Sequence, residues 1–171
     1  MAHMGALGIR DNDAVLTGTR SGRITMGLLS KLTKATTPQK KPSDDALLLH
    51  GMLCMAGADG TIEDAEIATV EGYFMQLPEF EGKDFQEVLF NAKKILARYP
   101  SMPESVKSLA DLSSPILKKK MFVLAADIAM ASGDVDESED EILESMQRVL
   151  NVDDETANKV LEVLNMKYQK V

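Results

Sequence analysis

Acidic side chains gather in two short segments of the chain that repeat each other. The first segment spans residues 55–66 and the second spans residues 128–139. In the alignment of the two, Gly60 falls on Gly133 and Glu66 falls on Glu139, so the repeat distance is 73 residues. Carboxylates at this density suit hard divalent cations, which take oxygen ligands. The two segments are therefore the first candidates for chemistry in the sequence.

Seven carboxylates in or beside these segments are candidate metal ligands. Each lies within seven residues of one of the repeated glycines, in a turn expected to join two helices or beside it. The ion that they would hold stays open between calcium, manganese and zinc. The candidates are Asp59, Glu63, Glu66, Asp127, Asp134, Asp136 and Glu139.

The EF-hand calcium loop is the nearest general template, and the first segment does not satisfy it. With the glycine of that loop placed on Gly60, Glu66 takes the position of the terminal bidentate glutamate. The first and third positions, which must supply oxygen side chains, fall on Met55 and Gly57. The second segment fails at the same positions, so neither is expected to be an EF-hand.

The competing interpretation is that both segments are purely structural turns. Gly60 and Gly133 can adopt the left-handed conformation that often ends a helix. Asp136 and Glu139 have the spacing of a capping box, in which two side chains satisfy backbone N–H groups at a helix start. The first segment fits this interpretation less well, because Glu63 is a poor N-cap residue. The residues alone leave cation binding and structural turns both open.

Apolar residues recur at helical spacing along the chain after residue 43. Residues 85–99 show the clearest amphipathic pattern, whereas residues 46–56 are apolar almost all round and are expected to be buried. Ser43 and Asp153 are expected N-cap residues. No segment alternates like a strand. The sequence predicts an all-α fold of about seven helices with an internal pseudo-two-fold duplication, broken near residues 57–62, 78–82, 100–103, 113–115 and 132–136.

Charge is distributed unevenly within a total of −8. Residues 1–41 carry seven Lys/Arg against two Asp, a net charge of +5, whereas residues 42–171 carry 12 basic against 25 acidic residues, a net charge of −13. We expect a flexible basic leader and linker at residues 1–42 and a helical domain at residues 43–171. The acidic domain is not expected to bind nucleic acid, because phosphates would repel it. A single cysteine fits a reducing compartment.

The doubled segment resembles the hallmark of the TerB-like tellurite-resistance family, the pattern A-x-x-D-G-x-[IV]-x-x-x-E occurring twice between helices. The resemblance covers roughly residues 44–168. It implies an all-helical acidic protein of stress operons that binds metal ions through these carboxylates. Asp59 and Glu66 match the hallmark in the first turn and Glu139 matches it in the second, where Ser132 replaces the aspartate. A hydroxyl is a weaker cation ligand than a carboxylate, so the first turn is expected to bind more tightly.

Three polar residues in apolar surroundings form a further candidate. His50 and Cys54 are four residues apart on one predicted helix and can face the same side. The 73-residue shift places Asp127 at the position equivalent to Cys54. Together the three could complete a soft metal or tellurium-oxyanion site. The alternative is a core cysteine, a hydrogen-bonded histidine and an aspartate that caps a neighbouring helix.

The leading hypothesis is a non-enzymatic stress-response protein of the tellurite-resistance type that binds divalent metal ions through both turns. No nucleophile elbow, phosphate-binding glycine loop or C-x-x-C pair points to catalysis. Other tellurite-resistance proteins at the inner membrane are candidate partners, and the expected location is cytoplasmic or peripheral at the membrane. The alternative is a helical adaptor with purely structural turns, recruited to a membrane face or a partner by its basic leader.

Overall fold

Helices make up all the regular secondary structure in the computed structural model, which describes residues 40–133 and 135–170. This confirms the all-α fold of about seven helices for the described residues. The predicted leader falls almost entirely on residues 1–39, which lie outside them. The α-helices are α2 (Asp44–Ala56), α3 (Asp64–Phe74), α4 (Phe85–Leu96), α5 (Met102–Ser105), α6 (Pro115–Ala131), α7 (Glu137–Leu150) and α8 (Asp154–Tyr168), and the 3-10 helices are η1 (Pro78–Phe80) and η2 (Val106–Asp111).

Local capping interactions set the starts of several helices. Asp153 is the N-cap of α8, as predicted, and its carboxylate accepts hydrogen bonds from the N–H of Thr156 at 2.8 Å and from its hydroxyl at 2.9 Å. Asp84 caps α4 in the same way by accepting from the N–H of Glu87 at 2.8 Å. Ser43 is the N-cap of α2 by backbone conformation, but its side chain makes no capping hydrogen bond.

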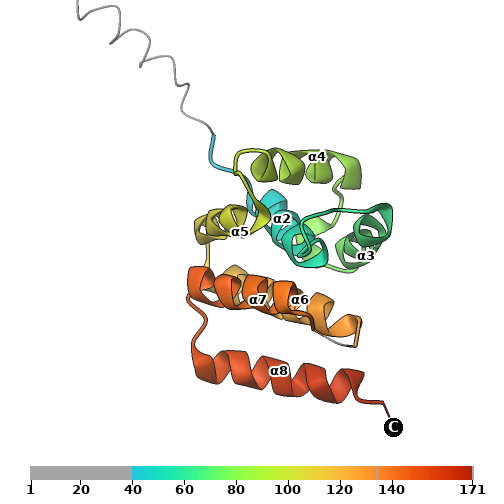
Figure 1. Cartoon of the computed structure of the whole chain (residues 1–171). Coiled ribbons are helices and arrows are strands. Elements are labelled where there is room, and N and C mark those ends of the chain that lie inside the picture. The colour runs from blue at the N-terminus through green and yellow to red at the C-terminus, as the bar shows by residue number, and fades with distance from the viewer. Residues whose placement is uncertain (1–39, 134, 171) are drawn as a thin grey trace, which may run out of the picture. The chain divides into compact units, whose positions relative to one another are not determined.

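The central helix of the core is α2, which packs against α3, α4, α6 and η2 (Figure 1). Ten consecutive residues, from position 46 to position 55, are buried, so every side of the helix faces protein. This confirms the expectation drawn from its uniformly apolar sequence. With 13 residues at about 1.5 Å each, α2 is about 20 Å long. It therefore holds the first acidic turn, which follows its C-terminal end, well away from Ser43 at its start.

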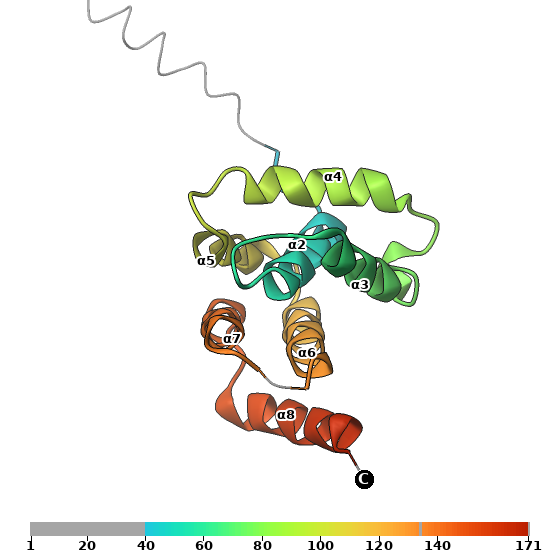
Figure 2. The ribbon, with the colours of Figure 1, turned by 45° about the vertical axis from the view of Figure 1, so that its right-hand side comes forward.

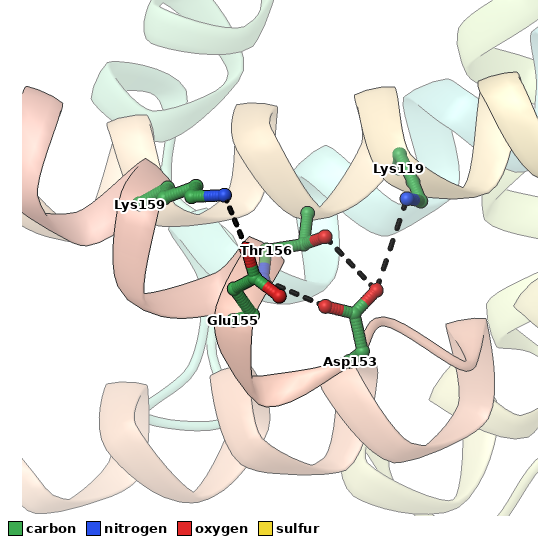
Figure 3. A network of polar contacts seen from close by, with 5 residues as sticks. All are labelled: Lys119, Asp153, Glu155, Thr156 and Lys159. Carbon is green, nitrogen blue, oxygen red and sulfur yellow. Dashed lines mark hydrogen bonds and ion pairs between the residues drawn. The ribbon is translucent and has the colours of Figure 1, made fainter.

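The two remaining long helices, α7 and α8, both pack against α6. Helix α6 packs on α2 and contacts both α7 and α8, and α8 forms the outermost layer of this side (Figure 2). Only Ala157 and Leu164 of α8 are buried. The start of α8 also carries two ion pairs on the surface, one between Asp153 and Lys119 of α6 and one between Glu155 and Lys159 (Figure 3). Exposed pairs of this kind contribute little stability.

Candidate functional site

The first acidic turn joins α2 to α3 and is shaped by its own side chains. Gly60 adopts φ +100°, a conformation that favours glycine, and its N–H donates to the carbonyl of Gly57 at 2.9 Å. Asp59 Oδ1 accepts two hydrogen bonds from Thr61, one from the N–H and one from the hydroxyl, both at 2.9 Å. Among the described residues no donor reaches Asp59 Oδ2. The turn therefore engages one carboxylate oxygen of Asp59 and leaves the other exposed to solvent.

Helix α3 begins with a capping box formed by Glu63 and Glu66. The N–H of Glu63 donates to Glu66 Oε2 at 2.6 Å. The first turn is therefore capped as well, but Glu63 makes no side-chain capping hydrogen bond of its own, as its poor N-cap propensity led us to expect. Glutamate is a poor N-cap by statistics, but the returning Glu66 carboxylate satisfies a backbone N–H that would otherwise have no partner in the helix. Glu66 Oε1 accepts no hydrogen bond from the described residues.

The second acidic turn joins α6 to α7 and has the same local geometry. Gly133 adopts φ +98°, close to the value at Gly60. Asp136 and Glu139 form a reciprocal capping box, since Asp136 Oδ1 accepts from the N–H of Glu139 at 2.9 Å and Glu139 Oε2 accepts from the N–H of Asp136 at 3.0 Å. The capping arrangement predicted for this turn is confirmed. Asp134 lies outside the described residues.

The two carboxylates of the capping box in the second turn, those of Asp136 and Glu139, differ in their electrostatic surroundings. Hydrogen bonds from Ser138 and from the N–H of Glu139 lower the pKa of Asp136 below its ordinary value. Glu139 is half-buried, and this burial raises the pKa of its carboxyl above the ordinary value. A carboxylate that is hydrogen-bonded and exposed keeps its charge most readily. Asp136 therefore stays ionised to a lower pH than Glu139.

The candidate ligands of the two turns do not form one compact cluster. Within residues 40–133 and 135–170, no group of three or more His, Cys, Asp or Glu side chains is placed so that it could hold a metal ion as the side chains stand. Asp59, Glu63 and Asp64 are exposed on the first turn. Their donor atoms are all oxygens, which fits calcium or manganese better than zinc, since zinc favours nitrogen and sulfur ligands.

Asp127 is separate from both turns and has its own partners. Its carboxylate accepts hydrogen bonds from the Tyr73 hydroxyl of α3 at 2.9 Å, from the Tyr168 hydroxyl of α8 at 2.8 Å and from Lys167 Nζ of α8 at 2.7 Å. Burial alone would raise the pKa of Asp127, but the three hydrogen bonds outweigh it and hold the pKa below its ordinary value. The cluster links α6 to α3 and α8, so Asp127 has a structural role and is not the cap of a neighbouring helix.

His50 and Cys54 lie together in the core, as their spacing predicted, but with Ser105 in place of Asp127. Cys54 Sγ is 3.5 Å from His50 Nε2 and 3.3 Å from Ser105 Oγ, and His50 Nε2 is 3.2 Å from the Ser105 carbonyl oxygen. Burial lowers the pKa of His50 to about 4 and raises the pKa of Cys54 to about 12. Both groups are therefore neutral at pH 7, which supports the core interpretation, and the predicted three-residue site is not formed.

Four residues of these clusters were missed in the sequence. A buried aspartate requires partners, which was the only signal that something must face Asp127. The sequence could not identify the donors to Asp127, because they lie 40 to 54 positions away along the chain. The missed residues are Tyr73, Ser105, Lys167 and Tyr168.

Comparison with known families decides the relationship of the chain. The family model described as tellurite resistance protein TerB matches residues 46–162. The chain belongs to the TerB family. The match to TerB begins in α2, ends within α8 and includes both acidic turns. No curated protein and no solved structure shows significant similarity to this TerB-family chain.

None of the described helices of this TerB-family chain combines the length and the apolar character that crossing a bilayer requires. The predicted cytoplasmic or peripheral location stays a prediction, as does recruitment by the basic leader, which falls outside the described residues.

Proposed function

We propose that this chain is a non-enzymatic tellurite-resistance-type protein that binds a divalent cation through its acidic turns, with the first turn as the tighter site. The observation that carries the proposal is the repeated turn geometry within a TerB-family domain. Each turn combines a glycine at φ near +100° with a carboxylate three residues into the following helix. Family membership supports the tellurite-resistance role, and the all-oxygen donor set supports a hard cation.

The caps set a limit on how a cation can bind. The N-terminus of a helix carries a partial positive charge of about half an elementary charge, which opposes a cation. Four carboxylates, those of Asp59, Glu63, Asp64 and Glu66, lie within the eight-residue segment 59–66. Their negative charge outweighs the partial positive charge of the helix N-terminus. A cation would use Asp59 Oδ2 and Glu66 Oε1, the oxygens that the turn does not engage. The exposed Glu63 and Asp64 side chains would rotate to complete the ligand set.

The second turn is expected to bind more weakly. Ser132 stands where the first turn has Asp59, so one charged ligand is replaced by a hydroxyl, and Ser132 Oγ donates to the carbonyl of Ala129 at 3.1 Å. This difference favours the first turn.

The reactive side chains of the core take no part in the proposed site. His50 and Cys54 are buried and neutral at pH 7, so neither is placed to act on a substrate. The proposed partners are the metal ion and other tellurite-resistance proteins at the inner membrane.

Calorimetric titration of the full chain with calcium, manganese and zinc tests the proposal. A site should also raise the melting temperature, and at a free cation concentration of 100 times Kd the stabilisation is about 2.7 kcal/mol. Asp59→Ala and Glu66→Ala should each remove most of this stabilisation, and Glu139→Ala should remove less. Failure to detect binding tighter than about millimolar for any of the three ions would reject the cation site and leave the turns as structural joints.

A further inference from the structure

A basic hollow lies at the corner of the core where α2 begins and α4 ends. Its volume is about 280 Å³, just below the range of roughly 300–1,000 Å³ that is typical of small-molecule sites. No acidic residue lines it. The lining combines four cationic side chains with two polar ones, namely Lys40, Lys41, Lys94 and Arg98 with Ser43 and Asn91.

These four cations have no carboxylate partner among the described residues. Half of the basic side chains in that part of the chain form ion pairs, namely Lys83, Lys107, Lys119, Lys120, Arg148, Lys159 and Lys167. The other half are Lys40, Lys41, Lys93, Lys94, Arg98, Lys118 and Lys170, so most of the unpaired cations gather at one corner. Like charges held together without counter-charges repel one another, which a bound anion would relieve.

The two carboxylates that follow Ser43 at the start of α2 are engaged elsewhere. Asp44 accepts hydrogen bonds from the N–H of Ser113 at 2.9 Å and from its hydroxyl at 2.5 Å. Asp45 forms an ion pair with Lys83 at 2.5 Å. The first acidic turn begins at the far end of α2, about 20 Å away by the helical rise. This is about two and a half Debye lengths at physiological salt, so the carboxylates of that turn do little to offset the positive charge of the hollow.

An exposed aromatic ring adjoins the basic hollow. Phe90 lies one turn before Lys94 on α4 and is 59% exposed, and Lys94 Nζ lies 4.1 Å from the centroid of its ring. Basic side chains beside an exposed aromatic ring are typical of surfaces that lie in the headgroup region of a bilayer. The chain before Lys40 carries five further Arg or Lys residues against two Asp, which continues the positive charge along the sequence.

We propose that this corner docks on the phosphate headgroups of an anionic lipid bilayer. Lys40, Lys41, Lys94 and Arg98 bind phosphate oxygens, and Phe90 enters the interface. A free phosphate ion would use the cations but gives the exposed ring no role. The docking surface lies in the core domain and does not depend on cation binding at the acidic turns.

Vesicle binding by the full chain tests the proposal. Partition is measured in chelator on vesicles of phosphatidylcholine with phosphatidylglycerol and on vesicles of phosphatidylcholine alone. Lys94→Gln with Arg98→Gln should lower the partition coefficient on the anionic vesicles about 25-fold, since each basic residue near an anionic surface contributes roughly five-fold. Lys159→Gln with Lys170→Gln removes the same charge elsewhere and should change it by less than about two-fold. Residues 1–39 are identical in both variants, so their contribution cancels.

Two further measurements complete the test. Phe90→Ala should lower binding several-fold even at high salt, where charge interactions are screened. Titration with inorganic phosphate, followed by shifts of the backbone amide resonances of residues 91–98, shows whether the hollow binds a free phosphate ion. Equal losses of partition in the double variant at Lys94 and Arg98 and in the control double variant at Lys159 and Lys170 would overturn the proposal. So would equal partition on neutral and anionic vesicles, or a response to inorganic phosphate without any response to vesicles.

Discussion

Replacing Asp127 with alanine tests whether one carboxylate holds α3 and α8 against α6. The substitution removes the acceptor for the hydroxyls of Tyr73 and Tyr168 and for Lys167 Nζ. Hydrogen bonds to charged groups contribute about 1.5–3 kcal/mol each when buried. The lysine is half exposed and its ion pair contributes less, roughly 0–1 kcal/mol. Since the tyrosines are half-buried and can turn toward water, we expect a net loss of about 2–4 kcal/mol.

Urea and thermal unfolding followed by circular dichroism measure this loss. For a domain of this size, a destabilisation of about 2–4 kcal/mol lowers Tm by roughly 8–15 °C. Asp111→Ala is the matched control, because Asp111 is exposed and its carboxylate has no hydrogen-bond partner among the described residues. The control should change stability by less than about 0.5 kcal/mol. Tyr73→Phe combined with Asp127→Ala should be less destabilising than the sum of the two, since both remove the same hydrogen bond.

The pH dependence gives a second readout for Asp127. Its folded pKa lies below the ordinary value, so the carboxylate stabilises the fold above the unfolded pKa of about 3.9. That contribution is lost as the pH falls through the lower folded pKa. The gap between the wild-type chain and Asp127→Ala should be the same at pH 7 and pH 5 and should shrink below about pH 4. A gap within error of that for Asp111→Ala at pH 7 would refute the argument.

The remaining predictions concern the two turns and the core cysteine. Glu66→Ala and Glu139→Ala should each destabilise the chain by about 0.5–2 kcal/mol in chelator, because each removes half of a capping box, as urea unfolding will measure. Gly60→Ala and Gly133→Ala should each cost about 1–2 kcal/mol in the same assay, since alanine is strained at φ near +100°, and no loss would contradict the observed turn geometry. Cys54 should not react with a thiol reagent at pH 8 until urea unfolds the chain, since it is 1% exposed and its pKa is raised to about 12. Rapid labelling of the native chain would contradict that placement.

Sequence patterns determined those parts of the structure that depend on near neighbours. The break after α2, the N-cap at Asp153 and the box between Asp136 and Glu139 each involve residues within a few positions of one another. Their backbone conformation follows from local hydrogen bonds and from the freedom of glycine, which a reader of the sequence can evaluate. The burial of α2 followed in the same way, because a helix that is apolar on every side has to be covered by protein.

N-cap statistics described only one of the two side chains at the start of α3. Glu63 is statistically a poor N-cap, and this led to the expectation that the first turn would fit a capping role less well than the second. In the structure Glu66 compensates by accepting from the N–H of Glu63, so the pair succeeds where the single residue is weak. Propensity is a weak prior for one position, and a reciprocal interaction three residues away is enough to override it.

Only the tertiary structure decided which distant side chains meet. Asp127 needed partners by its burial alone, but its donors come from α3 and α8, and Ser105 took the place that Asp127 was expected to fill beside Cys54. The basic hollow likewise brings Lys40 close to Arg98, and no local sequence pattern connects these two residues. Contacts between helices depend on how the helices pack, and packing is the sum of many small apolar contacts over the whole core. The spacing of residues in one sequence predicts the helices, whereas the packing of those helices decides which distant side chains come together.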